Sequence, residues 1–111
     1  MDVQNIGQPV NSEVSDADPA IAPDESYLLF CSHRDGGFGE SDLYITFRKQ
    51  EGSWTTPQNM GPGINTPASE EKPYVTPDGK YLFFSNDAPG NLEIYWVDAK
   101  IIEELKPDEL R

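Results

Sequence analysis

The chain has 111 residues, 36% of them hydrophobic and 11% aromatic, with ten prolines and nine glycines, which favours one domain of short, turn-linked segments over long helices. The net charge of −12 argues against a nucleic-acid or anionic-membrane partner, because phosphate binding requires clusters of lysine and arginine. No apolar run approaches the roughly 18–20 residues of a membrane span, and no basic stretch followed by an apolar one indicates a secretory signal, so the localisation stays open.

Turn signals divide the chain into short strands. The quartets "PDES" (23–26) and "PDGK" (77–80) place proline and aspartate at the centre of β-turns, and each precedes an aromatic and aliphatic run. Near the C-terminus, Ile101, Ile102 and Leu105 fall at helical spacing before Pro107, which predicts a short amphipathic helix on the outer rim or bottom face. In chain order, we predict strands over 20–22, 27–32, 43–48, 53–56, 74–76, 81–85 and 93–97.

Residues 5–32 and 59–86 are copies of one sequence. They align at an offset of 54 with ten identities in 28 pairs, and the strands that follow align at an offset of 51. A period near 50 is typical of repeat architectures. The second strand of each copy is an unbroken apolar run, which indicates burial on both faces, as in sheets stacked face to face. We therefore predict a first repeat with an N-terminal closing strand over 1–58, and a second repeat with the C-terminal helix over 59–111.

The stretch "PYVTPDGKYLFFS" (73–85), followed by "EIY" (93–95), resembles the TolB-like, WD-like β-propeller repeat family. The first copy departs from this pattern, because Ala22 stands at a Ser/Thr position and Glu25 and Ser26 replace Gly-Lys. The resemblance extends over residues 5 to 100. It implies an all-β fold of two four-stranded antiparallel propeller blades and periplasmic or secreted parent proteins, but it specifies no activity.

Two blades do not close a propeller, which needs roughly four to eight. Two bare sheet faces would expose more apolar surface than soluble monomers usually carry. Either the chain is a structural fragment of a larger exported propeller protein, or identical copies assemble head to tail into a ring. Three chains would give six blades and four would give eight; we favour the trimer. Residues 2–6 align with the end of the first repeat, so a neighbour's N-terminus is predicted to complete the outer edge of the second blade.

In the resembled fold, loops from successive blades surround one mouth of a central channel. Here those loops carry many acidic side chains, which could bind a cation, a basic peptide or a small ligand. Their spacing matches no known calcium loop, so we predict no metal site and no cofactor. The candidate ligand-binding residues are His33, Arg34, Asp35, Asp16, Asp18, Glu70, Glu71, Asp87 and Tyr74, with Glu13 and Glu40 on the same rim.

Two residues have catalytic potential. His33, the only histidine, could act as a general base oriented by Asp35, but no nucleophile motif and no second histidine accompanies it. The sequence "SHRDGG" (32–37) also fits a structural loop in which Arg34 and Asp35 tie neighbouring strands together. Cys31, the only cysteine, lies in an apolar run and excludes an intrachain disulfide, so we expect a buried small hydrophobe.

These patterns favour a non-catalytic propeller module that self-assembles into a ring and serves as a protein- or ligand-binding scaffold. The alternative is a hydrolase or lyase acting on a saccharide or peptide through carboxylates and His33 at the channel mouth. Among the aromatic residues, Trp54 is expected on an outer strand, and Tyr74 on the innermost strand is expected to line the channel.

Overall fold

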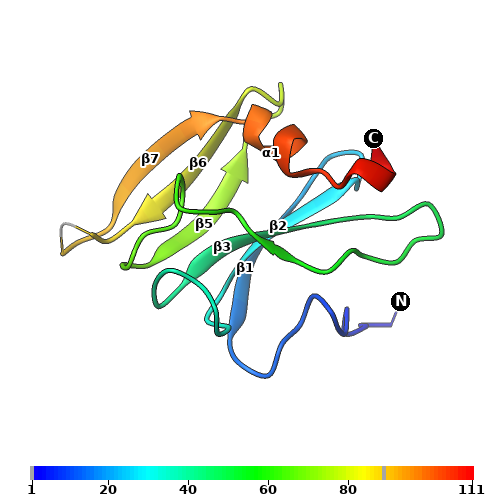
Figure 1. The fold of residues 1–111 in the computed structure, drawn as a ribbon, viewed down its shortest axis with the longest axis horizontal. Coiled ribbons are helices and arrows are strands. Elements are labelled where there is room, and N and C mark those ends of the chain that lie inside the picture. Colours follow the sequence, from blue (N-terminus) through cyan, green and yellow to red (C-terminus); the bar gives the residue numbers. More distant parts are fainter. Residues whose placement is uncertain (1, 89) are drawn as a thin grey trace.

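The computed structural model describes residues 2–88 and 90–111, and it contains two antiparallel sheets, which confirms an all-β fold (Figure 1). The first sheet, in the order β1-β2-β3-β4, consists of β1 (Asp16–Ile21), β2 (Tyr27–Ser32), β3 (Asp42–Phe47) and β4 (Gln58–Asn59). The second sheet, in the order β5-β6-β7, consists of β5 (Glu70–Val75), β6 (Tyr81–Asn86) and β7 (Glu93–Asp98). Each sheet is built from one copy of the repeat, except that β4 crosses the predicted boundary between residues 58 and 59.

The first strand of each sheet begins four residues earlier than predicted, because a β-bulge interrupts it. Asp18 in β1 and Lys72 in β5 adopt the left-handed conformation, with φ of 55° and 54°. The register with the neighbouring strand shifts at both positions. A bulge of this kind inserts an extra residue and lets pairing continue beyond it. The two bulges occupy equivalent positions, so the duplication extends to backbone conformation.

The predicted strand over 53–56 is wrong. Trp54 forms only an isolated bridge with Arg48, and the segment paired with β3 is β4. The Thr55 side chain explains the difference. Its Oγ1 accepts the Phe47 N–H at 3.0 Å, in place of the backbone carbonyl that would accept this N–H in a regular strand pair. In the described part of the second copy, no fourth strand pairs with β7.

One apolar core lies between the two sheets. Leu29, Leu43 and Ile45 from the first sheet are fully buried against Leu82 and Phe84 from the second. Burial of a side chain of this size stabilises the fold by roughly 1.5–3 kcal/mol. The two sheets therefore stack face to face, and β2 is buried on both faces as predicted, whereas β6 is buried on one face only, because no further sheet covers its other face.

The predicted C-terminal helix is present as α1 (Lys100–Leu105), followed by the short 3₁₀ turn η1 (Asp108–Leu110). Ile102 is buried in the core between the sheets, and the Leu105 carbonyl accepts a hydrogen bond from the Gln58 side chain at 2.9 Å. Lys106 is extended, as expected for a residue before proline, and this ends the helix. The helix covers one end of the core (Figure 1). Among the described residues, no helix is long and apolar enough to cross a membrane.

Candidate functional site

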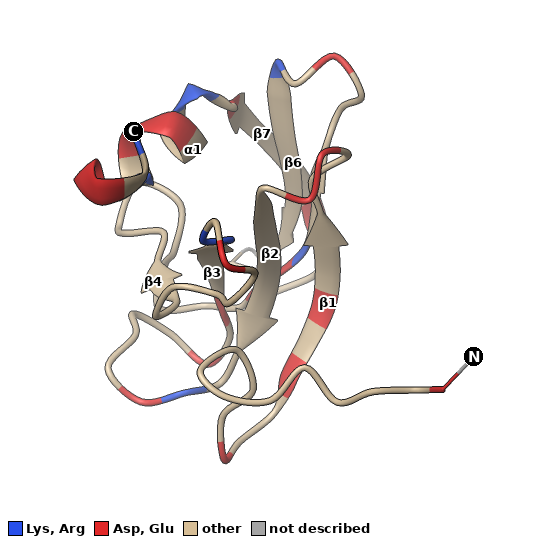
Figure 2. Cartoon of the chain, turned by 90° about the vertical axis from the view of Figure 1, so that its right-hand side faces the viewer, with Lys and Arg blue, Asp and Glu red and all other residues tan. Residues whose placement is uncertain are grey.

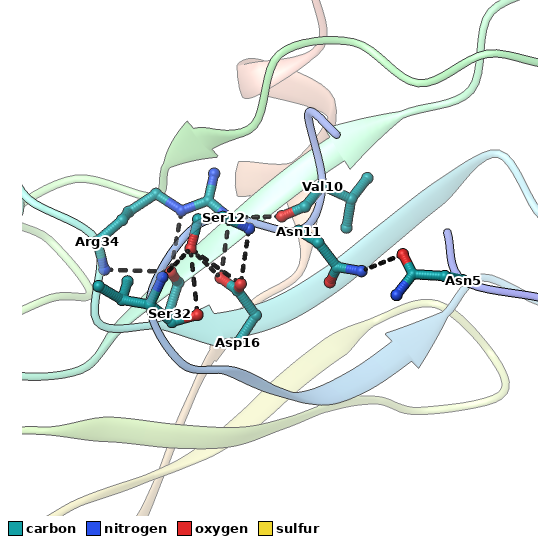
Figure 3. A network of polar contacts seen from close by, with 8 residues as sticks. Asn5, Val10, Asn11, Ser12, Asp16, Ser32 and Arg34 are labelled. Carbon is teal, nitrogen blue, oxygen red and sulfur yellow. Dashed lines mark hydrogen bonds and ion pairs between the residues drawn. The ribbon is translucent and has the colours of Figure 1, made fainter. Parts of the chain in front are cut away.

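The equivalent carboxylates of Asp16 and Glu70 are bound to the loops that precede them. Asp16 accepts the Ser12 N–H at 2.8 Å and the Ser12 hydroxyl at 2.9 Å (Figure 3). Glu70 accepts the Thr66 N–H at 2.9 Å and the Thr66 hydroxyl, four residues upstream in both copies. Asn86 adds a third donor to Glu70 at 2.7 Å. These two candidate residues therefore close turns within the fold and offer little free coordinating capacity.

Arg34 joins the loop after β2 to the N-terminal part of the chain. Its guanidinium forms an ion pair with Asp16 at 3.0 Å and donates to the carbonyl of Val10 (Figure 3). Its centre also lies 5.2 Å from the ring of Phe30 and 5.0 Å from the ring of Tyr44, within the range of cation–π attraction. Arg34 therefore ties this loop to β1 and to the N-terminal segment, whereas no such contact of the Asp35 side chain is found among the described residues.

The Asp16 carboxyl is held in its charged form. Burial raises its pKa, but hydrogen bonds from Ser32, Ser12 and Arg34 outweigh that effect and lower the pKa to about 2. Donors to the charged form of a carboxyl stabilise that form. Asp16 is therefore ionised near neutral pH, and its carboxylate oxygens already accept hydrogen bonds from within the chain.

The Glu70 carboxyl has the opposite shift. Burial raises its pKa, the hydrogen bonds from Thr66 oppose the rise, and the nearby charges of Asp42 and Asp87 add to it. Within the part of the chain that the structure describes, no ion pair involves Glu70, and Ala88 stands where the first copy has Arg34. Two like-charged neighbours and burial together favour the neutral form of a carboxyl.

His33 and Asp35 lie in the loop after β2, and both side chains are exposed. The His33 N–H donates to the Ser15 carbonyl at 3.0 Å, so the backbone rather than the imidazole anchors this position. In the described residues, the structure shows no hydrogen bond or ion pair between these two side chains. Glu13 and Glu40, on the same rim, are exposed as well.

Three other candidate residues, Asp18, Glu71 and Asp87, contact groups of their own chain. Asp18 accepts the Lys72 N–H at 3.1 Å and the Cys31 thiol at 3.4 Å, which links the two bulges. Asp87 accepts the Ser69 N–H at 2.8 Å. Glu71 forms a long ion pair of 3.8 Å with the exposed side chain of Lys72. In residues 2–88 and 90–111, no group of three histidine, cysteine, aspartate or glutamate side chains is arranged to hold a metal ion.

Cys31 and Tyr74 occupy contrasting environments. Cys31 is buried, and burial raises the pKa of its thiol to about 11, which fits the expected small hydrophobe. Tyr74 is exposed on β5 beside Pro73, Pro19 and Ile21, where a groove of about 430 Å³ separates β1 from β5. The groove lies along the first strands of the two sheets, β1 and β5.

The second sheet has an uncovered apolar face, here called the open face, which consists of Tyr81, Phe83, Ile94 and Trp96. The sequence predicted bare sheet faces but did not identify these residues. Ile94 and Trp96 are 77% and 63% exposed, and Tyr81 packs edge-on against Trp96. At the equivalent positions of the first sheet, Leu43 and Ile45 are 0% exposed because the second sheet covers them. The alignment of the third strands at an offset of 51 gives the equivalent positions, but it does not indicate which of the two sheets is left uncovered.

An apolar hollow lies on the opposite side of the molecule. It has a volume of about 420 Å³ on the far face of the first sheet, and its walls include Ile6, Ile21 and Trp54. Leu28 and Phe30 of β2 form its floor. Their equivalents in β6, Leu82 and Phe84, are the residues that cover the first sheet within the chain.

Comparison with protein-family models finds no match to this chain, and comparison with curated proteins finds none either.

Proposed function

We propose that the protein is a non-catalytic β-propeller module whose copies assemble head to tail into a ring of three chains and six blades. The observation that carries the proposal is the open face, where Ile94 and Trp96 are exposed although their equivalents in the first sheet, Leu43 and Ile45, are fully buried. A soluble protein rarely exposes such a contiguous patch unless another surface covers it.

The chain supplies the covering surface itself. Within the chain, the face of the first sheet that contains Leu43 and Ile45 packs on the face of the second sheet that contains Leu82 and Phe84. Between chains, the open face would pack in the same way on the hollow floored by Leu28 and Phe30 of the next copy. These two surfaces are different and lie on different sheets, so the contact would be heterologous, and such contacts form a ring when the rotation from copy to copy closes.

The scaffold would present the rim of acidic loops and the groove beside Tyr74 once per chain around its central channel. With a net charge of −12 per chain, the ring favours cationic protein segments or small cationic molecules as ligands. The residues that the structure describes give a hydrolase or lyase no support: Asp16 and Glu70 are engaged in turns, and the exposed His33 side chain has no hydrogen bond or ion pair that would orient it.

The test is the solution mass, measured by light scattering on a sizing column over a wide range of protein concentration. A trimer has a mass near 37 kDa, three times the 12.4 kDa of the chain, and a tetramer near 50 kDa, four times that value. Trp96→Glu places a charge in the open face and is expected to give a monomer. Phe38→Glu is the matched control, because Phe38 is a large exposed side chain outside the open face and the hollow. A monodisperse 12.4 kDa species at every concentration would refute ring assembly.

A further inference from the structure

Residues 5–11 fold into the same loop as residues 59–65. Asn5 Oδ1 accepts the Gly7 N–H at 2.7 Å and the Asn11 side-chain amide at 2.9 Å. In the second copy, Asn59 Oδ1 accepts the Gly61 N–H and the Asn65 side-chain amide, both at 2.8 Å. Both glycines have positive φ, 74° and 92°, as this turn requires. The N-terminal loop therefore has the hydrogen bonds of its internal copy, although its Gln8–Pro9 peptide bond is cis and the equivalent bond between residues 62 and 63 is trans.

The internal copy of the loop has a defined binding partner, the outer edge of β3. Asn65 is buried, accepts the Leu43 N–H at 2.8 Å and donates to the Leu43 carbonyl at 3.0 Å. The Met60 N–H donates to that same carbonyl at 3.0 Å, and β4 pairs with β3 alongside. One asparagine thus occupies both polar groups of a strand residue that would otherwise lie on an unpaired edge.

The N-terminal loop lacks this partner within its own chain. Among the described residues, the Asn11 side chain bonds only to Asn5. Ile6 is 45% exposed, whereas its equivalent, Met60, is 2% exposed. The segment before the loop extends away from β1 (Figure 2). The backbone equivalent to Leu43 is that of Ile94 in β7, which lies on the far side of the molecule from the N-terminus (Figure 1).

We propose that the N-terminal loop of one copy binds the outer edge of β7 in the neighbouring copy whose open face packs on its hollow. Gln4 and Asn5 would pair with β7 as the fourth strand of the second sheet, as Gln58 and Asn59 pair with β3. The Asn11 side chain would accept the N–H of Ile94 and donate to its carbonyl. The proposal rests on head-to-tail assembly and identifies the segment and the side chain that join the copies. It also removes an exposed strand edge, which natural sheets generally protect.

Hydrogen exchange of the Ile94 amide in the assembled full-length protein tests this contact directly. We expect the Ile94 amide to be protected to about the same degree as the Leu43 amide, which Asn65 holds within the chain. Asn11→Ala should accelerate Ile94 exchange at least tenfold and raise the concentration for half-assembly at least tenfold, since it removes two hydrogen bonds. Gln8→Ala, an exposed position in the same loop, is the control and should change neither value.

A second variant guards against a folding defect at Asn11. Ile6→Pro removes the N–H equivalent to that of Met60, at a position that is 45% exposed in its own chain. It should also expose the Ile94 amide. An assembled wild-type protein whose Ile94 amide exchanges as fast as an unpaired edge would overturn this contact and leave ring assembly intact. A wild-type protein that stays monomeric at all concentrations would overturn both.

Discussion

Replacement of Arg34 by methionine should destabilise the fold by about 2–3 kcal/mol at pH 7. Methionine keeps the apolar stem but removes donors to Ser32 Oγ at 2.9 Å, to Asp16 at 3.0 Å and to the Val10 carbonyl. A hydrogen bond involving a charged group contributes about 1.5–3 kcal/mol. The Arg34 and Asp16 side chains are 19% and 10% exposed, so their ion pair is intermediate between exposed and buried. Breaking an exposed pair costs about 0–1 kcal/mol of stability, and breaking a buried pair costs about 3–5 kcal/mol.

Urea unfolding of the full chain measures this loss, and the Trp96→Glu background removes any contribution from assembly. A double-mutant cycle with Asp16→Asn isolates the ion pair, for which we expect a coupling of about 1–2 kcal/mol. Arg34→Lys should recover about half of the loss, because lysine keeps the charge without the planar fork that reaches three acceptors. A coupling below about 0.5 kcal/mol, or a loss of that size for Arg34→Met, would refute the reasoning that Arg34 anchors the N-terminal part of the chain.

Two further predictions concern acid stability and loop packing. The Asp16 pKa is lowered from 3.8 to about 2, so the contribution of this carboxylate to stability is present above pH 3.8 and is lost as the pH falls through 2. Relative to Asp16→Asn, the wild type should lose about 1–2 kcal/mol of unfolding free energy between pH 5 and pH 2. An equal acid dependence of both proteins in urea unfolding would contradict this. Gly39→Ala should cost more than about 2 kcal/mol, because an added Cβ would lie 2.3 Å from the carbonyl oxygen of Thr66, whereas Gly63→Ala, in open space, should be nearly neutral in thermal unfolding.

The apolar strands were predictable from sequence, and the irregular ones were not. The unbroken apolar run of residues 27–32 and the turn before it define β2 to the residue. By contrast, the bulges at Asp18 and Lys72 place residues that are not glycine in a left-handed conformation, which composition does not indicate. The fourth strand was misplaced because Trp54 and Thr55 favour strands, whereas the residues that pair are the polar Gln58 and Asn59.

The acidic residues of the rim show the same limit at the level of the site. The repeat predicted loops before the first strands and after the second strands, but Asp16, Asp18, Glu70 and Glu71 lie within β1 and β5, and the direction of each side chain was not predictable. The near match of Ser12 and Thr66, each four residues before an acid, contained the information that Asp16 and Glu70 close local turns. The open face was not predictable from the sequence of either repeat, because its exposure depends on which sheet has no neighbour to cover it.

The link between the two bulges makes successive joints of the proposed ring chemically unequal. Inside a chain, the Asp18 carboxylate receives the backbone N–H of the following bulge, at Lys72. At the joint between chains, the side chain in the place of that carboxylate is the Lys72 ammonium, which has no lone pair to offer. The bond is therefore impossible at every second joint. The assembly would have threefold symmetry rather than sixfold symmetry, and dilution or force should separate it along three seams into intact two-sheet units.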